Sequence, residues 1–299
     1  MNYRILVPLD GSRLADKVVP WADAWAESMG AELELLRAVG APVPSVFAEG
    51  APVADYYFTE QDVVRAHRVL EETAREGFKG SSRVDLRVME GAAAQVILDR
   101  AHERAFDLIM MSTHGRGGLT RTLLGSIAGK VLRRAGAPVV TVRADLGGPP
   151  RAPKRVLVPI NDSDLAAGIL PPLVLFAKTV PLEMTLYWLA PGMADTRAGE
   201  AAIQELADGL RSANINTQVR IERGADPAAM IASIAHREAF DLIAMSTHAR
   251  SGLGRWVLGS VTEWTIRHAD VPVMAIRPQE PLESSKSLAV AGSVQGSAR

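Results

Sequence analysis

A glycine-containing stretch, STHGRGGLTRTLLGS at residues 112–126, holds residue types that can bind a phosphate group. Glycines let backbone N–H groups come close to a phosphate, and the N-terminus of a following helix adds partial positive charge. The hydroxyl of Ser126 would add one more donor. Such a stretch can also be only a tight turn between a strand and a helix, so both interpretations stay open.

A second candidate is Asp10, which ends the apolar run RILVPLD at residues 4–10. Its carboxylate could bind a ribose hydroxyl or a phosphate-bound Mg²⁺, because Mg²⁺ prefers carboxylate and phosphate oxygens. Gly11 and Ser12 follow it, so Asp10 could equally cap the first helix. We interpret His114 and His248, in the two glycine-containing loops, as local hydrogen-bonding residues rather than catalysts.

The sequence lacks the signatures of common nucleotide-processing and hydrolytic enzymes. It has no G-x-x-x-x-G-K-S/T loop, no H-x-G-H and no G-x-S-x-G, and His102-Glu103 lacks the second histidine of H-E-x-x-H. It also has no cysteine, which excludes disulfides, zinc–thiolate sites and thiol nucleophiles. We therefore assign no catalytic residue and expect ligand binding with little or no turnover. A slow ATPase, an adenylyl-transferring ligase or another hydrolase is the enzymatic alternative.

The segments around these residues occur twice. RILVPLD returns as RVLVPIN, starting 151 residues later, and AFDLIMMSTHG (105–115) returns as AFDLIAMSTHA, starting 134 residues later. GSIAGKVLRRAGAPVVTVR (125–143) and GSVTEWTIRHADVPVMAIR (259–277) are a third matching pair. The difference of 17 residues between the offsets falls around 41–59 in the first copy. Three ordered blocks of this kind establish an internal duplication.

Each copy alternates strands and helices. RILVPL, DLIMM and APVVTV are short apolar runs without polar alternation, typical of strands covered on both faces. Five strands and their crossover helices predict an open parallel sheet with helices on both faces, so the fold class is α/β with two tandem sheets. Helices are expected at 60–78, 121–135, 197–212 and 255–268, and the tryptophans are expected to pack in the core.

The Gly- and Pro-rich segment ADLGGPPRAPK (144–154) predicts a linker between two domains, 1–146 and 151–278. Residues 279–299 are polar and Ser/Gly-rich, and we expect them to be disordered. We also expect the two halves to pair through their last strands, 138–143 and 272–277, because these apolar strands would otherwise leave exposed edges.

Charge and hydropathy exclude several kinds of partner. There are 33 basic and 34 acidic residues, a balance that disfavours nonspecific nucleic-acid binding. No run of about 18 apolar residues is present, so we expect no membrane span. The N-terminus reaches Asp10 too early for a signal peptide, and we expect a cytoplasmic protein.

The loop pattern resembles the ATP-binding branch of the universal stress protein family. Its motif is Gly, two residues, Gly, nine residues and Gly-Ser/Thr; here Ser112 replaces the first glycine, while Gly115, Gly125 and Ser126 match. The likeness runs from ILVPLDGS to APVVTV and covers nearly all of each repeat. It implies an adenine-nucleotide alpha-hydrolase-like fold with strand order 3-2-1-4-5, ATP and Mg²⁺ at the point where the strand order reverses, and a regulatory role in stress.

The resemblance also assigns site residues. It places the adenine near the backbone of Val39 and makes Asp10 the ribose- or Mg²⁺-facing acid. The whole first site is Pro8, Leu9, Asp10, Val39, Met111, Ser112, His114, Gly115, Gly125, Ser126 and Ile127. The second, weaker site is Asn161, Ser246, His248, Ala249, Gly259 and Ser260.

The second copy departs further from the motif. Asn161 replaces Asp10 and removes the negative charge, and Ala249 replaces Gly115 and adds a methyl group. A scaffold that dimerises without nucleotide is therefore the alternative to a nucleotide sensor. The extra segment 41–59 could cover a nucleotide as a lid or be a surface loop. A homodimer of whole chains stays open.

Overall fold

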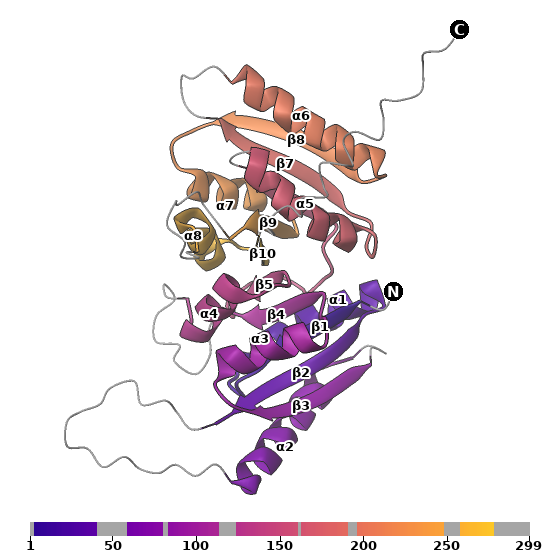
Figure 1. Ribbon diagram of the computed structural model, residues 1–299, viewed down its shortest axis with the longest axis vertical. Coiled ribbons are helices and arrows are strands. Elements are labelled where there is room, and N and C mark those ends of the chain that lie inside the picture. Colours follow the sequence, from indigo (N-terminus) through magenta and orange to yellow (C-terminus); the bar gives the residue numbers. More distant parts are fainter. Residues whose placement is uncertain are drawn as a thin grey trace, which may run out of the picture.

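The computed structural model describes residues 3–40, 59–79, 83–113, 124–160, 163–190, 196–247 and 258–277 (Figure 1). The first half contains β1 (Arg4–Pro8), the short 3-10 helix η1 (Asp16–Val18), α1 (Val19–Met29), β2 (Glu32–Val39), α2 (Glu60–Gly77), β3 (Val84–Glu90), α3 (Ala93–Glu103), β4 (Leu108–Ser112), α4 (Ser126–Arg134) and β5 (Val139–Val142). The second half contains β6 (Arg155–Ile160), α5 (Ser163–Ala177), β7 (Glu183–Ala190), α6 (Arg197–Ser212), β8 (Asn216–Arg223), α7 (Pro227–Arg237), β9 (Leu242–Ser246), α8 (Ser260–His268) and β10 (Val273–Ile276).

The strands of both halves form one ten-stranded sheet in the order β3-β2-β1-β4-β5-β10-β9-β6-β7-β8. Within each half the strands are parallel and follow the expected order 3-2-1-4-5. The halves meet where β5 and β10 pair antiparallel, with Val140 opposite Met274. The predicted pairing through the last strands is thereby confirmed, and the two parallel sheets become one mixed sheet.

Strand alternation divides the core between the two faces of this sheet. Ile5 and Val7 of β1 pack on the face covered by α1, α2, α5 and α6, whereas Leu6 packs on the face covered by α3, α4, α7 and α8. Each of the two hydrophobic clusters contains residues from both halves. The apolar core is therefore continuous across the β5–β10 seam, and the two halves stabilise each other through it.

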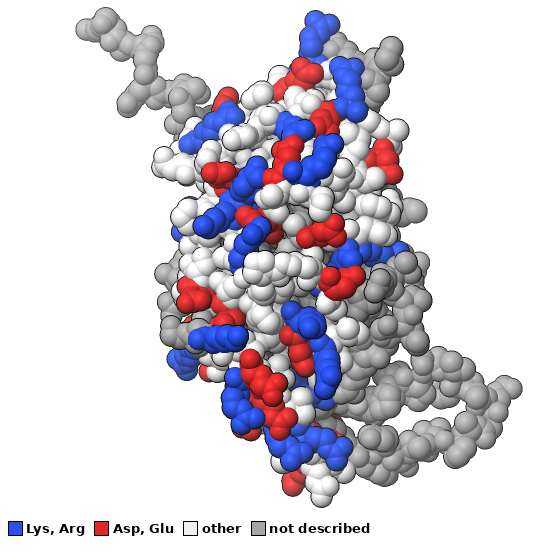
Figure 2. Space-filling view, turned by 180° about the vertical axis from the view of Figure 1, so that it is seen from behind, with Lys and Arg blue, Asp and Glu red and all other residues white. Residues whose placement is uncertain are grey.

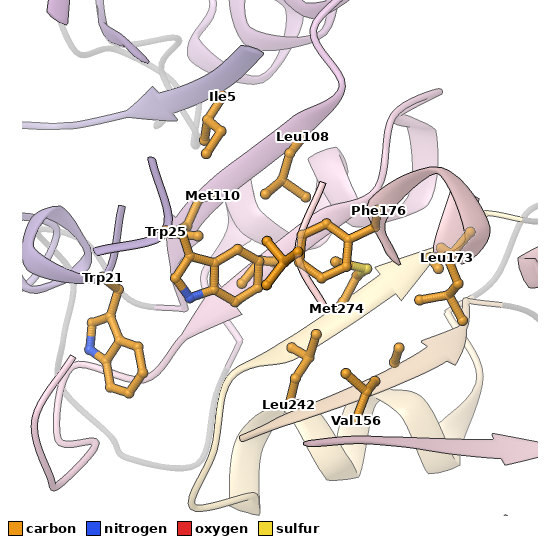
Figure 3. Packing of buried hydrophobic residues seen from close by; sticks show 14 of the residues in the cluster. Ile5, Trp21, Trp25, Leu108, Met110, Val156, Leu173, Phe176, Leu242 and Met274 are labelled. Atoms are coloured by element: carbon orange, nitrogen blue, oxygen red, sulfur yellow. The ribbon is translucent and has the colours of Figure 1, made fainter. Parts of the chain in front are cut away.

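Aromatic residues join the halves on the first of these faces (Figure 3). The ring of Phe176 in α5 lies 5.4 Å from that of Trp25 in α1 and 6.3 Å from that of Tyr3, between ring centroids. The indole N–H of Trp25 also donates to the carbonyl oxygen of Arg151 in the connecting segment, at 3.0 Å. This contact satisfies the polar atom of a fully buried indole and holds the connection against α1.

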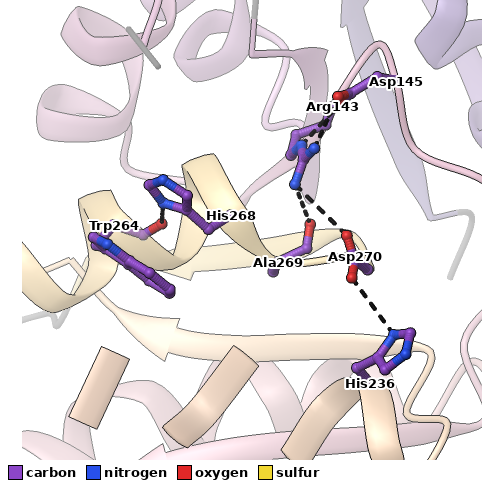
Figure 4. A network of polar contacts seen from close by, with 7 residues as sticks. All are labelled: Arg143, Asp145, His236, Trp264, His268, Ala269 and Asp270. Carbon is purple, nitrogen blue, oxygen red and sulfur yellow. Dashed lines mark hydrogen bonds and ion pairs between the residues drawn. The ribbon is translucent and has the colours of Figure 1, made fainter. Parts of the chain in front are cut away.

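Polar contacts cross the seam near the end of β5 (Figure 4). The Arg143 guanidinium donates to the carbonyl oxygen of Ala269, which follows α8, at 3.2 Å, and lies 3.7 Å from the Asp270 carboxylate. Asp145 accepts two further bonds from the same guanidinium, at 3.0 and 2.9 Å. His236 of α7 lies 3.5 Å from Asp270 on its other side. One arginine of the first half thus binds the C-terminal end of a helix of the second half.

The most similar repeated residues have structural roles. Asp107 accepts the backbone N–H of Arg4 at 2.9 Å, and the Arg4 guanidinium lies 4.6 Å from the centre of the Phe106 ring. The second half repeats this arrangement with Arg155, Phe240 and Asp241, at 2.9 and 4.8 Å. The shared AFDLI segment therefore ties the start of β1 or β6 to the start of β4 or β9.

Some expectations from the sequence were wrong in detail. The helices predicted at 121–135 and 255–268 begin at Ser126 and Ser260, because Gly125 and Gly259 have extended backbones that close the preceding loops. Trp264 is not a core residue; it is 36% exposed and stacks on His268 with ring centroids 4.2 Å apart. The expected disordered tail and Trp256 lie outside the described residues.

The surface carries charges of both signs. Figure 2 shows Lys and Arg interspersed with Asp and Glu over one face of the molecule. Among the described residues, no helix is long and apolar enough to cross a bilayer.

Candidate functional site

The candidate site lies where the strand order of the first half reverses. β2 follows β1 on one side, and β4 pairs with β1 on the other. The β1–β2 ladder runs on to Pro8, opposite Leu36, whereas the β1–β4 ladder pairs Ile5 and Leu6 with Leu108 and Ile109. Open α/β sheets bind ligands outside the carboxyl ends of their strands at such a point.

The predicted residues at the ends of β1 and β4 reach this edge. Pro8, Leu9, Met111 and Ser112 are buried, and the Asp10 side chain is half-buried. The buried residues hold the two strand ends rigidly, while Asp10 reaches the solvent side.

Two backbone hydrogen bonds close the base of the glycine-containing loop. The N–H of Thr113 donates to the carbonyl oxygen of Val142 at 3.1 Å, and the N–H of Gly125 donates to the carbonyl oxygen of Thr113 at 3.0 Å. Thr113 is 1% exposed. The start of α4 is therefore fixed beside the end of β4, although 11 residues separate Thr113 from Gly125 in the sequence. Sequence reasoning missed Thr113, although the shared MST of both repeats marked it.

The N-terminus of α4 has no side-chain cap. Its N-cap is Gly125, with φ −55° and ψ 142°, whereas α2 has a Thr59–Asp62 capping box and α7 is capped by Asp226. The conformation of Gly125 is open to any residue, so the glycine is not needed for its backbone angles. The exposed Ser126 and Ile127 begin the helix. Free first-turn N–H groups at this position suit an anionic ligand.

Asp10 organises the turn that follows β1. Its Oδ1 accepts the backbone N–H of Ser12 at 2.9 Å, and the Ser12 hydroxyl accepts the N–H of Ala15 at 3.1 Å. The helix-capping alternative was wrong, because the N-caps of η1 and α1 are Ala15 and Val18. Asp10 instead holds a loop turn at the edge of the sheet.

Two charged residues that the sequence reasoning missed lie beside Asp10. Gly11 has φ +74°, and a Cβ atom built on it would be 2.0 Å from Nη1 of Arg37, so the guanidinium lies against the main chain there. Burial raises the pKa of Asp16, the neighbouring Asp10 raises it further, and Arg37 lowers it. Asp10, Asp16 and Arg37 therefore form one charged cluster, which a comparison of the repeats could have revealed.

Val39, the expected adenine contact, is the last residue of β2 and is half-buried. Its carbonyl oxygen accepts the N–H of Gly91 at 2.8 Å. The sheet therefore already uses this backbone group. His114 and Gly115 of the first site, and Asn161, His248 and Ala249 of the second, lie outside the described residues, as does 41–58 of the extra segment.

The second half repeats the loop closure. The N–H of Thr247 donates to Ile276 at 2.9 Å, and the N–H of Gly259 donates to Thr247 at 3.0 Å. Here the hydroxyl of Thr262 in α8 also donates to the carbonyl oxygen of Ser246, at 2.8 Å. Ser260 is exposed at the start of the helix. The backbone framework is therefore shared by both halves, and the side chains at the strand ends differ.

The donor set in the first half suits a Mg²⁺ ion that is held mainly by phosphate oxygens. Asp10 and Asp16 are the carboxylates at this edge, and Mg²⁺ on a nucleotide commonly uses one or two protein carboxylates. No group of three or more His, Asp or Glu residues able to hold a metal occurs in the described part of the chain. A metal here would come with its nucleotide.

The fold and this edge define a class: a duplicated α/β protein with doubly wound sheets joined at their last strands. Comparison with known proteins agrees. The model of the universal stress protein family matches residues 1–143 and again 153–277. The chain belongs to the universal stress protein family.

Relatives of similar length share the tandem form. A universal stress protein of Mycolicibacterium smegmatis is 26% identical over 296 residues, covering 93% of this chain and 98% of the relative. One of Thermus aquaticus is 33% identical over 145 residues, covering 48% of this chain and all of the relative. The crystal structure of a universal stress protein from Archaeoglobus fulgidus covers 92% of this chain and 98% of its own, with 21% identity and a TM-score of 0.71. This last likeness establishes the fold.

Proposed function

We propose that the first half binds an adenine nucleotide, with ATP as the preferred form, and that the chain acts as a regulatory sensor with little or no turnover. The phosphates would lie at Gly125, Ser126 and the N-terminus of α4. Asp10 would face the ribose or the Mg²⁺ ion of the nucleotide, and the end of β2 at Val39 would lie beside the adenine.

The observation that carries this proposal is the closed loop at the switch point. The Thr113–Gly125 hydrogen bond sets an uncapped helix N-terminus next to the ends of β1 and β4. Anionic groups are stabilised at such a terminus by its N–H donors and its dipole. The Asp10 carboxylate, held at the same edge by Ser12, supplies an acceptor for hydroxyl groups.

A scaffold function is the second candidate, and features of the second half favour it. Asn161 and Ala249 replace Asp10 and Gly115 there. The halves also share one continuous core and one sheet, as a module built for assembly would. We propose that the second half supports the first and binds nucleotide weakly.

Calorimetric titration of Mg²⁺–ATP into the full chain tests the proposal. We expect about one tight site per chain, and Gly125→Val should weaken it by roughly tenfold or more, since one lost hydrogen bond to a charged group is worth ~1.5–3 kcal/mol. Valine adopts the φ and ψ of Gly125 without strain, so the fold should persist.

Gly259→Val, the matched change in the second half, is the control and should leave the tight site unchanged. Absence of any nucleotide binding by the parent chain would support the scaffold function instead. Incubation of the saturated chain with ATP, followed by measurement of ADP, tests turnover, and repeated turnover would contradict a sensor that does not hydrolyse its ligand.

A further inference from the structure

Asp10 and Asp16 lie on one rigid turn. Asp10 accepts the N–H of Ser12, and the N–H of Asp16 donates to the carbonyl oxygen of Ser12 at 3.1 Å. The positive φ of Gly11 lets the chain reverse between the two acids. Asp16 is half-buried, and its Oδ1 is inaccessible to solvent and accepts no hydrogen bond from the described residues. The turn thus presents two carboxylates at the same edge of the sheet.

Arg37 supplies the cation for this turn from the neighbouring strand β2. Its guanidinium lies flat against Gly11, between the acids in sequence, where a Cβ atom would come within 2.0 Å of Nη1 and 2.7 Å of Cζ. The charges acting on Asp16 are Asp10 and Glu76, which repel it, and Arg37, which attracts it. Without Arg37, the turn would carry uncompensated carboxylates.

All three charged positions change together in the second half. Asn161, Ala167 and Trp188 stand where Asp10, Asp16 and Arg37 stand in the first half. Trp188 follows Tyr187 of β7 just as Arg37 follows Leu36 of β2, in the same register with the central strand. The Trp188 indole packs against Gly199 in the first turn of α6, where a Cβ atom would lie 2.3 Å from Cη2. The cluster is therefore a property of the first half.

We propose that Arg37 is a positioning residue of the nucleotide site, which holds the Asp10 carboxylate ionised and oriented toward the ribose hydroxyls rather than toward a metal ion. This inference rests on the proposed function. A guanidinium beside Asp10 repels a divalent cation at that carboxylate, since like charges a few ångströms apart interact unfavourably. Hydroxyl groups are neutral donors and bind an ionised carboxylate without that penalty.

The test compares Mg²⁺–ATP with Mg²⁺–2′,3′-dideoxyATP, which lacks both ribose hydroxyls, by calorimetry on the full chain. The parent should prefer ATP by about tenfold or more, the value of one hydrogen bond to a charged group. Arg37→Gln should reduce this preference to about threefold or less, by weakening ATP and not the dideoxy analogue. The ratio of affinities with Mg²⁺ and with EDTA should stay the same.

The double variant Arg37→Gln/Asp16→Asn distinguishes positioning from simple folding damage. It removes the repelling acid together with the cation, so the preference for ATP should return at least in part, and it also serves if Arg37→Gln alone does not fold. Arg83→Gln is the matched control, because this arginine lies 74% exposed at the opposite edge of the sheet and pairs with Asp85.

Three results would overturn the inference. The first is an unchanged ribose preference in folded Arg37→Gln, with no loss in the double variant. The second is a collapse of the Mg²⁺ dependence instead of the ribose preference, which would place Asp10 at the metal. Binding of ATP and dideoxyATP with equal affinity by the parent is the third, and it leaves the proposed function intact. A parent chain that binds neither nucleotide overturns both proposals.

Discussion

The ion pair between Glu34 of β2 and Arg100 of α3 is buried beneath the first half of the sheet. The guanidinium donates to both carboxylate oxygens, at 2.6 and 2.5 Å, and the two side chains are 5% and 10% exposed. The second half has no such pair: Thr185 and Ile234 occupy the equivalent positions. We therefore predict that Glu34→Thr alone destabilises the chain, because it leaves a buried guanidinium unpaired.

The magnitude follows from the burial of this pair. Removing one partner of a buried ion pair costs about 3–5 kcal/mol, whereas replacing both partners by well-packed groups is often neutral. The double variant Glu34→Thr/Arg100→Ile, which copies the second half, should therefore recover most of the loss. The free energy of coupling between the two positions should exceed about 2 kcal/mol.

Urea unfolding of the four proteins in this cycle, followed by circular dichroism and by tryptophan fluorescence, measures these values. Coincident transitions would establish that the halves unfold together, as their shared core implies. A cost below about 1 kcal/mol for Glu34→Thr would refute the reasoning, because it would mean that water or a rearranged partner satisfies Arg100. A double variant that loses the sum of the two single costs would also refute it.

Two further predictions concern the second half. Phe176→Ala should lower the free energy of unfolding by about 3–5 kcal/mol, because it empties the space between Trp25 and Tyr3; a loss below about 1 kcal/mol in urea unfolding would show that the halves do not depend on this contact. Burial, together with the nearby Glu222, raises the pKa of Tyr187 from 10.0 to about 12, so the fold favours the neutral phenol. Its contribution to stability is therefore complete below pH 10.0 and lost as the pH rises toward about 12. Tyr187→Phe should flatten this decline in thermal unfolding, and parallel curves for the two proteins would contradict it.

The comparison of the two halves suggests how a duplicated domain divides its roles. The backbone at the loop base is the same in both, with Thr113–Gly125 and Thr247–Gly259 hydrogen bonds of equal length. The charged cluster around Arg37 occurs in one half, and a packed Trp188 in the other. One half can thus specialise in a ligand while the other contributes packing, because the β5–β10 pairing does not involve the side chains of the site.

Much of the site could be located from the sequence. The loop at 112–126 and the acid at Asp10 stood out by residue type, and the strand order placed them at one edge. The start of α4 was placed too early, because a glycine N-cap with an extended backbone looks in sequence like the first turn of the helix that follows it. The helix-cap interpretation of Asp10 was wrong because the chain inserts a turn and η1 before α1.

The sequence by itself determined the duplication, the α/β class and the order of strands, since apolar runs and turn residues are local signals that recur in both copies. Only the tertiary structure decided which distant side chains meet. Arg37 lies 26 residues beyond Gly11 in the sequence and reaches it because the parallel register of β1 and β2 sets the two strand ends side by side. The Glu34–Arg100 pair depends in the same way on how α3 crosses the sheet. Such contacts come from the packing of whole elements, which residue spacing does not encode.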